Sequence, residues 1–328
     1  MLGHGVERAK LGKGDAIHCS ISIIVSSQSA GLILWRRDRH IGTPFPIRRP
    51  NMAHTILITG CSSGFGRATA KRFADAGWNV VATMRNTQSA GDLAERENIL
   101  VTPLDVQDRE SITAAIAAGI ARFGAIDALV NNAGFGLHGI FEETPRDKVM
   151  EQFDVNLFGA MDTIRAILPH FRERKAGAIV NISSGAGVFA LPASTLYNSS
   201  KFALEGFSEA LAYELAPLGI IVKIVEPGGV LETGFLNRAN EERDSTSKIA
   251  DYTAVSAAVA EIFKNLAADR QETTSAQVAD VIFTAVTDGT DQMRYIATPD
   301  IVELVKLRRE AGEDAYMQAM RDAFTLTI

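Results

Sequence analysis

Residues 55–66 read TILITGCSSGFG, and this stretch decides the fold because an apolar run leads directly into three spaced glycines. Gly60 permits a tight turn, Gly64 lets the backbone approach a pyrophosphate, and Gly66 allows close packing of a helix on a strand. A helix beginning here would present free N–H groups and the positive end of its dipole to phosphates. The stretch predicts a dinucleotide-binding strand–loop–helix unit, and the alternative is an ordinary glycine-rich turn.

Short apolar runs alternate with longer amphipathic stretches along the chain from residue 55. The apolar runs predict strands at 55–59, 79–83, 99–104, 127–131, 177–182, 219–225 and 292–297. The amphipathic stretches predict helices at about 64–76, 108–123, 145–174, 194–217 and 275–287. This pattern is typical of an α/β protein. We predict a single Rossmann-type, doubly wound domain with a mostly parallel seven-stranded sheet, whose ligands gather at the carboxyl ends of the strands.

The composition excludes several classes of protein. The 328 residues carry a net charge of -6, which argues against a nucleic-acid surface. Cys19 and Cys61 are the only cysteines, so a disulfide framework cannot form. The Cys and His residues also lack the spacing of a zinc site. We therefore predict a reducing compartment, the cytoplasm, and no metal.

The first 51 residues differ from the rest of the chain. They hold eight Lys or Arg against three acidic residues, a net charge of +5, whereas the remainder carries -11. The apolar run at 21–35 is shorter than the roughly 20 residues of a membrane span. The Arg-rich and Ser-rich composition faintly resembles a transit peptide, and a secretory signal fits less well. Because Met52 leads directly into the first strand, we predict that residues 1–51 are an extension, unstructured or not translated, and that 52–328 form the folded domain.

The end of the second predicted strand indicates which dinucleotide is bound. An acidic residue that would hold a ribose 2′-hydroxyl is expected about 20 positions past the glycines. Met84 lies about there and Arg85 follows it. A guanidinium suits a 2′-phosphate, so Arg85 favours NADP(H), with NAD(H) possible; the alternative is a solvated loop charge.

Two further strand ends carry polar residues. Asp105 could accept a hydrogen bond from adenine or could cap the next helix, and the sequence does not decide between these roles. Asn-Asn-Ala-Gly at 131–134 could make a simple turn or could fix the strand edge beside the cofactor.

A tyrosine and a lysine stand four residues apart in the predicted helix at 194–217. Tyr197 and Lys201 share one face, so the ammonium could favour the ionised phenol and suit it to acid–base chemistry. Such pairs also occur by chance on solvated helix faces. Position strengthens the functional interpretation, because Tyr197 lies 131 residues after Gly66 and 13 after Ser184.

Together these residues resemble the classical branch of the short-chain dehydrogenase/reductase family over nearly all of residues 53–230. Each motif is weak alone, but their order and spacing are specific. The resemblance rests on Thr-Gly-x-x-x-Gly-x-Gly at 59–66, Asn-Asn-Ala-Gly at 131–134, Asn156, Ser184, Tyr197, Lys201 and Pro227-Gly228.

The resemblance implies a role for each of four catalytic residues. Tyr197 would exchange a proton with the substrate oxygen, and Lys201 would lower the tyrosine pKa and bind the nicotinamide ribose. Ser184, rather than the adjacent Ser183, would orient the substrate carbonyl or hydroxyl. Asn156 would kink its helix and hold a water leading to Lys201, unless it is a surface amide.

The resemblance also implies the residues around the cofactor and the substrate. The cofactor residues would be Gly60, Ser62, Ser63, Gly64, Phe65, Gly66, Arg85, Asp105, Val106, Asn132, Ala133, Gly134, Tyr197, Lys201, Pro227, Gly228 and Val230. Ser184 and Tyr197 would contact the substrate. The chain departs from the family in one place: Thr233 stands five positions after Gly228, where a spacing of four is usual, so its contact to the carboxamide is in doubt.

The substrate region is expected at about 228–270, where the composition resembles a mobile lid. Apolar residues at 189–192, with Leu231, Phe235 and Leu236, favour a lipophilic substrate, although they could equally be core. The expected reaction interconverts a secondary alcohol and a ketone or aldehyde. Two alternatives are reduction of a 3-oxoacyl thioester and a non-catalytic NADP(H)-binding sensor. By analogy with the family, a homodimer or homotetramer without a membrane span is expected, and the C-terminal part, 298–328, is expected to be helical with solvated charges at 308–313.

Overall fold

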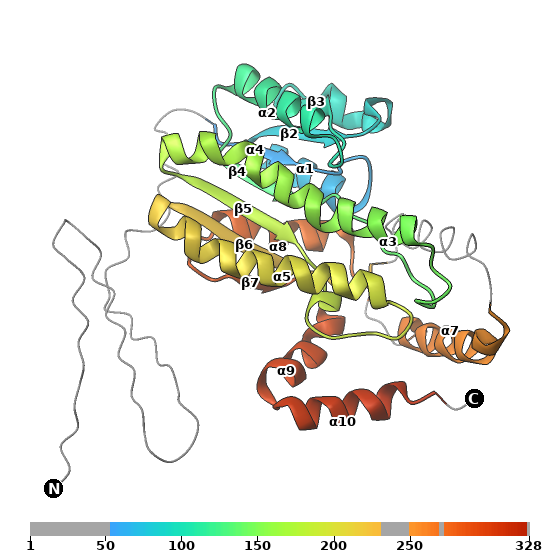
Figure 1. The fold of residues 1–328 in the computed structure, drawn as a ribbon. Helices are drawn as coiled ribbons and strands as arrows, with labels where there is room; N and C mark the ends of the chain where they lie inside the picture. The colour runs from blue at the N-terminus through green and yellow to red at the C-terminus, as the bar shows by residue number, and fades with distance from the viewer. Residues whose placement is uncertain (1–52, 231–248, 269–271, 327–328) are drawn as a thin grey trace, which may run out of the picture. The chain divides into compact units, whose positions relative to one another are not determined.

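A seven-stranded parallel sheet runs through the computed structural model, which describes residues 53–230, 249–268 and 272–326 (Figure 1). The strands are β1 (Thr55–Ile58), β2 (Asn79–Met84), β3 (Ile99–Pro103), β4 (Ala128–Asn131), β5 (Gly177–Ile182), β6 (Ile220–Glu226) and β7 (Arg294–Ile296). Their order across the sheet is β3-β2-β1-β4-β5-β6-β7. Every described pairing is parallel, which confirms the Rossmann-type prediction and extends "mostly parallel" to the whole described sheet. The predicted extension at 1–51 lies outside the described residues.

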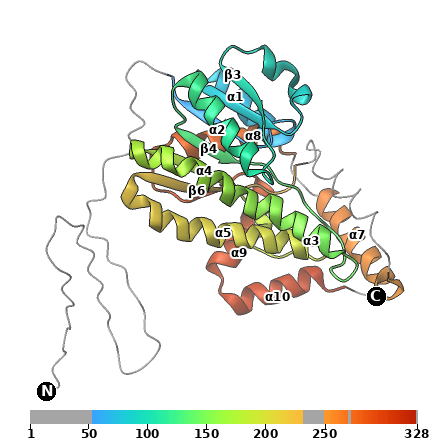
Figure 2. The ribbon, with the colours of Figure 1, turned by 45° about the horizontal axis from the view of Figure 1, so that its top comes forward.

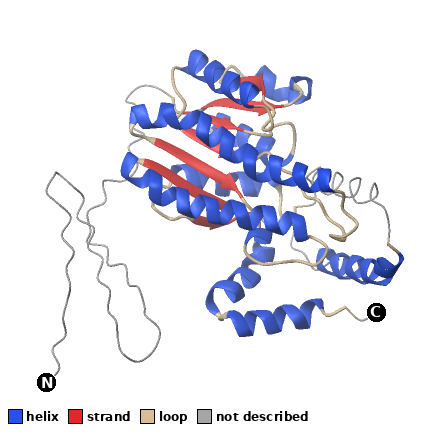
Figure 3. Ribbon diagram, viewed as in Figure 1, coloured by secondary structure: helices blue, strands red, loops and turns tan. Residues whose placement is uncertain are grey.

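Helices cover both faces of the sheet (Figure 3). One face packs against α1 (Gly64–Asp75) and α8 (Ser275–Thr287), and the other against α2 (Arg109–Phe123), α4 (Gly159–Arg174) and α5 (Thr195–Leu215). The alternation of side chains along a strand produces the two cores. In β1, Ile56 and Ile58 belong to the first core and Leu57 to the second. The uninterrupted apolar strands in the sequence therefore reflect burial on both sides.

The long helix predicted at 145–174 is divided in the structure. It consists of α3 (Arg146–Phe153), a π-helical turn at Asp154–Phe158 and α4. A π-helical turn inserts one residue into the helical hydrogen-bond pattern, and such turns are frequent at functional sites. Asn156 lies in the middle of this turn, as its expected kink requires.

The C-terminal part forms a small core of its own with the loop that follows Ser184. The helices α9 (Val302–Glu310) and α10 (Glu313–Phe324) lie together at one side of the sheet (Figures 1 and 2). The cluster consists of Val188, Phe189, Ile301, Val305, Tyr316 and Met320. Phe189 is only 2% exposed, so it belongs to this core, and the prediction that it lines the substrate region is wrong.

The charges at 308–313 are not all solvated, contrary to the sequence-based expectation. Arg309 donates to Glu226, which is fully buried, over 2.5 Å. Arg308 pairs with Glu313 and lies over the ring of Tyr316. Apolar packing and ion pairing thus fasten α9 to the sheet.

Three further elements complete the described chain. A 3-10 segment, Thr87–Glu95, follows β2. The helix α7 (Thr253–Ala268) follows a short 3-10 turn at Ala250–Tyr252. Among the described residues, no helix has the length and apolar character needed to cross a membrane.

Candidate active site

The glycine loop connects β1 to α1 and leaves the amino end of the helix open. Ser63 is the N-cap residue, but its side chain makes no capping hydrogen bond, and the first turn contains no acidic residue. The first N–H groups of a helix have no partner within the helix and attract anions. These residues therefore fit a pyrophosphate, because neither a cap nor a carboxylate competes for the site.

Backbone conformation at Gly60 and close packing at Gly66 explain why these two loop residues are glycine. Gly60 has a φ of +74°, a conformation that favours glycine. A Cβ at Gly66 would lie 2.3 Å from the carbonyl oxygen of Gly60 and 2.5 Å from Nδ2 of Asn132. The loop can pass this close to α1 only without a side chain at position 66.

The asparagines at the end of β4, Asn131 and Asn132, fix two strand edges. Nδ2 of Asn132 donates to the carbonyl oxygens of Thr59 and Gly60, over 2.9 and 3.1 Å. Asn131 donates to Asn181 at the corresponding end of β5, over 2.9 Å. Of the two roles that the sequence left open for 131–134, these contacts support fixing the strand edges over a simple turn.

Arg85 and Asp105 follow the carboxyl ends of β2 and β3. Arg85 follows β2 directly and is exposed, whereas Met84 is only 2% exposed. Asp105 accepts from the backbone N–H of Gln107, and Asp108 caps α2 instead. The helix-cap alternative for Asp105 is therefore wrong, and its carboxylate closes a short turn at the end of β3.

The remaining predicted cofactor residues line the same edge of the sheet in different environments. Ser62, Ser63 and Gly134 are exposed, Phe65 and Ala133 are partly buried, and Val106 and Val230 are buried. Val106 packs beneath the first turn of α4, where a Cβ at Gly159 would lie 2.7 Å from it.

Four predicted catalytic residues come together at the carboxyl edge of the sheet. The phenol of Tyr197 is hydrogen-bonded to Ser184. Nζ of Lys201 lies 5.8 Å from the centre of the tyrosine ring and donates to the carbonyl oxygen of Ile182 over 2.9 Å. A Cβ at Gly134 would lie 3.1 Å from Oδ1 of Asn156 and 3.7 Å from Nζ of Lys201, so these two side chains converge on one point.

Asn156 is 2% exposed, so the alternative of a surface amide is wrong. Its Oδ1 accepts from the N–H of Phe135, and its Nδ2 donates to the carbonyl oxygen of the same residue over 2.8 Å. Nδ2 also lies 3.2 Å from the hydroxyl of Ser200. Asn156 thus holds the segment after β4 against α5.

Burial controls the ionisation of the central pair. It raises the pKa of Tyr197 to about 12, and the hydrogen bond with Ser184 only partly offsets this. Burial also lowers the pKa of Lys201 to about 8, against the favourable charge of Glu205. The expected lowering of the Tyr197 pKa by Lys201 is therefore absent from the protein without its cofactor. The Lys201 ammonium donates to the carbonyl oxygen of Ile182 instead.

The loop after β6 is held by two residues that the sequence did not reveal. The N–H of Gly228 donates to Oγ1 of Thr298 over 2.7 Å, and the N–H of Gly229 donates to Asp300 over 3.1 Å. The carbonyl oxygen of Pro227 accepts from Gly185, next to Ser184. Thr298 and Asp300 follow the short strand β7, and no motif marked them. The predictions for Leu231, Thr233, Phe235 and Leu236 fall outside the described residues.

A histidine beside the tyrosine was also missed. The ring of His138 lies 5.6 Å from that of Tyr197, and its Nδ1 lies 2.8 Å from the hydroxyl of the buried Ser194. In the same segment, Glu143 accepts from the N–H of Ile249, and Glu142 accepts from Tyr252, each over 2.8 Å. The segment that brings His138 beside Tyr197 is therefore also bound to residues 249–252.

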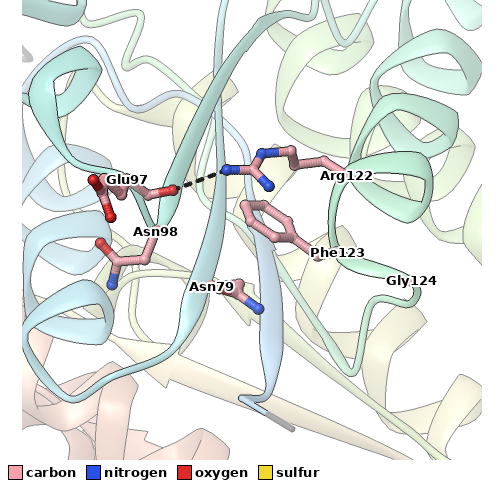
Figure 4. Close-up of a pocket in the computed structure, with 6 residues that line it drawn as sticks. All are labelled: Asn79, Glu97, Asn98, Arg122, Phe123 and Gly124. Carbon is pink, nitrogen blue, oxygen red and sulfur yellow. Dashed lines mark hydrogen bonds between the residues drawn. The ribbon is translucent and has the colours of Figure 1, made fainter.

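A groove at the opposite end of the sheet is separate from this site (Figure 4). It is lined by Asn79, Glu97, Asn98, Arg122, Phe123 and Gly124. These residues stand at the amino ends of β2 and β3 and at the end of α2. Ligands of doubly wound sheets bind at the carboxyl ends, so this groove is not the candidate active site.

The parallel sheet, the open helix end and the buried Tyr–Ser–Lys–Asn set define a dinucleotide-binding oxidoreductase. A family model described as short chain dehydrogenase matches residues 54–244. Human 17-beta-hydroxysteroid dehydrogenase type 1 is 34% identical over 296 residues, which cover 83% of this chain and 87% of that protein.

Solved structures give the same result. A short chain dehydrogenase/reductase from Burkholderia phymatum in complex with NAD has a TM-score of 0.69 and 26% identity, covering 81% of this chain and 95% of that chain. ElxO with NADP bound has a TM-score of 0.63 and 28% identity, covering 77% and 100%. The chain belongs to the short-chain dehydrogenase family, as its sequence predicts. It is an NAD(P)-dependent oxidoreductase that acts on CH–OH groups.

Proposed function

We propose that the chain is an NADP(H)-dependent carbonyl reductase and alcohol dehydrogenase that uses Asn156, Ser184, Tyr197 and Lys201 in catalysis. The observation that carries this proposal is the convergence of these buried polar groups beside the open amino end of α1. A protein that only bound a dinucleotide would not need the hydrogen bond between Tyr197 and Ser184 at this place. The sensor alternative therefore has less support.

The residues have distinct roles in the proposed reaction. The bound nicotinamide supplies or accepts the hydride, and the chain supplies orientation and a proton. Ser184 holds the substrate oxygen beside the Tyr197 hydroxyl, which donates its proton during reduction. With a pKa of about 12, the phenol stays protonated through the neutral range, which suits reduction. Lys201 holds the ribose and, while charged, makes Tyr197 a stronger acid.

Arg85 supports the preference for NADP(H) within this proposal. Its guanidinium is exposed after β2, where the adenosine ribose is expected, and can donate two hydrogen bonds to a 2′-phosphate in a bidentate contact. Met84, which stands where an acidic residue would serve NAD(H), is buried and offers no acceptor for a 2′-hydroxyl.

A lipophilic alcohol or ketone is the substrate class that we favour. The human relative acts, by its name, on hydroxysteroids, and this chain covers most of its length. Reduction of a 3-oxoacyl thioester on an acyl carrier would need basic residues at the mouth of the site. Residues 138–145, which include His138 beside Tyr197, instead carry Glu142 and Glu143 and no Lys or Arg.

We also propose that the chain self-associates through α4 and α5, the helices that form interfaces in the family. Phe158 and Phe202 are 45% and 40% exposed, and Tyr213 is 72% exposed. Phe158 ends the π-helical turn before α4, and Phe202 and Tyr213 lie on α5. Exposed large apolar side chains of this kind are typical of an interaction surface.

A screen of NADPH oxidation tests the proposed function. The panel should include a ketosteroid, a retinal, a long-chain ketone, a small aldehyde and a 3-oxoacyl thioester, each also tested with NADH. We expect turnover with a lipophilic carbonyl and a lower KM for NADPH than for NADH. Tight NADPH binding without turnover of any carbonyl would favour the sensor, and absence of both would contradict the proposal.

A further inference from the structure

A chain of charged groups, of which Glu205 and Glu226 are buried, connects Lys201 to β7 and α9. Helix α5 carries Lys201, Glu205 and Glu209 at intervals of four residues, which places them along one face. Lys201 is 6% exposed and Glu205 is 7% exposed. A buried carboxylate one helical turn from a buried ammonium is costly to maintain unless the two charges support each other.

Arg294 on β7 connects this helix to the sheet. Its guanidinium donates to Glu205 over 3.0 Å and to Glu209 over 2.5 Å. It also lies 3.7 Å from Glu226 at the end of β6, and Glu226 in turn accepts from Arg309 on α9 over 2.5 Å. The chain of contacts therefore extends from α9 to Glu205, one helical turn from the candidate catalytic lysine.

The charges of this cluster balance only when Lys201 is included. Glu205, Glu209 and Glu226 are three carboxylates, and Arg294 and Arg309 are two guanidinium groups. The Lys201 ammonium supplies the third positive charge. Removal of the charge of Glu205 would leave an excess of positive charge beside a buried lysine, and like charges disfavour the protonated form.

Glu205 is also closely packed. A Cβ at Gly187 would lie 2.6 Å from the hydroxyl of Ser183, 3.0 Å from Cγ of Glu205 and 3.2 Å from the carbonyl oxygen of Lys201. Only a glycine fits between these groups, so Cγ of Glu205 is packed closely beside Gly187 and Ser183, after the end of β5. Lys201 donates to Ile182 at that same strand end. The packing leaves Glu205 little freedom to turn away.

We propose that Glu205 is a positioning residue, which keeps the Lys201 ammonium charged and aligned for the nicotinamide ribose and is itself set by Arg294. The proposal rests on the function proposed above. Burial already lowers the pKa of Lys201 to about 8. A further decrease would therefore leave the lysine partly deprotonated in the neutral range. The groups that interact with Glu205 are Lys201 from α5, Ser183 after β5, Glu226 from β6 and Arg294 from β7. Glu209 from α5 shares Arg294 with Glu205.

The pH dependence of NADPH binding tests this role without a substrate. The dissociation constant should be measured by NADPH fluorescence between pH 7 and 10, where the 2′-phosphate is fully ionised. We expect wild-type binding to weaken as Lys201 loses its proton. In Glu205→Gln the same weakening should occur about one pH unit lower. At pH 7 its affinity should remain within a few-fold of wild type.

Two variants distinguish a local effect from a structural one. Glu209→Gln removes a carboxylate from the same helix and the same arginine, but Glu209 is 45% exposed and one turn farther from Lys201. Its binding curve should coincide with that of wild type. Glu205→Asp keeps the charge and should restore the wild-type curve. Glu205→Met removes the charge without a buried amide and serves if the glutamine variant does not fold.

Coincident curves for Glu205→Gln and wild type, with both proteins folded by circular dichroism, would overturn the proposal. So would an equal shift in Glu209→Gln, because the effect would then reflect net charge alone. If wild-type protein does not bind NADPH at any pH, the proposed function fails instead, so the two failures are distinguishable.

Discussion

Arg85 is the residue on which the proposed cofactor preference depends. It is exposed at the end of β2, and no hydrogen bond within the described chain commits its guanidinium elsewhere. A charge-assisted hydrogen bond contributes about 1.5–3 kcal/mol, which corresponds to roughly 10- to 100-fold in binding. Its contribution should apply to NADP(H) and not to NAD(H), because only the former carries the 2′-phosphate.

Replacement of Arg85 by alanine is therefore expected to raise the KM for NADPH about tenfold or more and to leave the KM for NADH nearly unchanged. Steady-state kinetics with both cofactors measure the effect. Arg109→Ala is a suitable control, because Arg109 is an exposed arginine that pairs with Asp162 on the other face of the sheet. An unchanged KM for NADPH in Arg85→Ala would remove the basis for the assignment.

At the scale of single elements, the glycine loop and α5 offer a matched pair of substitutions. Gly66→Ala would place a methyl group 2.3 Å from the carbonyl oxygen of Gly60, whereas a Cβ at Gly206 would have nothing within 4 Å. Gly66→Ala should destabilise the protein by about 1–3 kcal/mol and weaken NADPH binding. Gly206→Ala should stabilise it by about 0.5–1 kcal/mol, because alanine favours a helix interior. Thermal unfolding and NADPH titration of both variants check this.

A buried lysine on the neighbouring strand β6 stabilises the edge strand β7. Nζ of Lys223, on β6, donates to Asp288 over 2.6 Å and to the hydroxyl of Tyr295 over 2.8 Å. Burial alone would raise the pKa of Asp288, but hydrogen bonds from Lys223, Tyr295 and Thr290 hold this pKa at about 2. A lowered aspartate pKa means that the native state favours the charged form, so the stabilisation is present above about pH 4 and is lost as the pH falls towards 2.

Asp288→Asn should lower the free energy of unfolding by about 3 kcal/mol at pH 7, because it leaves the Lys223 charge buried without its carboxylate. The difference from wild type should shrink between pH 5 and pH 2. Urea unfolding at several pH values measures it. Asp280→Asn, at a side chain 62% exposed and paired with Arg72, should have almost no effect. A pH-independent difference would contradict the electrostatic explanation.

The sequence predicted most of the fold, because the physical signals for its elements are local. Strands buried on both faces appear as apolar runs, and the observed strands lie within two residues of their predicted bounds. The π-helical turn was predicted only as a kink at Asn156, because its extra residue leaves no pattern in polarity. The C-terminal cluster was missed because Phe189 meets Tyr316 and Met320 only in the folded chain.

In the candidate site, too, the sequence predicted the residues that have local signals and missed those that depend on long-range contacts. Tyr197, Lys201 and the glycines were found because helical spacing and loop context constrain their chemistry. Thr298 and Asp300 could not be found, since their contact with the loop after β6 spans 70 residues or more. The high pKa of Tyr197 also could not be predicted, because spacing does not reveal that the Lys201 ammonium points to a backbone carbonyl.

At the scale of the whole molecule, the exposed apolar residues of α5 and of the turn between α3 and α4 predict self-association. Phe158→Glu combined with Phe202→Glu should convert an oligomer into monomers, because burial of these carboxylates at an interface is costly. Light scattering coupled to size-exclusion chromatography measures the mass. Met317→Glu, at a 36% exposed position on α10, should leave the mass unchanged. A monomeric wild-type protein would contradict this prediction.

The central claim is that the Tyr197 hydroxyl transfers the proton, and one substitution tests it most directly. Tyr197→Phe removes that hydroxyl and little else, so the carbonyl-reduction kcat, measured with the ketone or aldehyde identified in the screen, should fall by about 10²- to 10⁴-fold. The dissociation constant for NADPH, measured by fluorescence on the same sample, should stay within about twofold of wild type. A variant that binds NADPH normally and retains near-wild-type kcat would contradict the account.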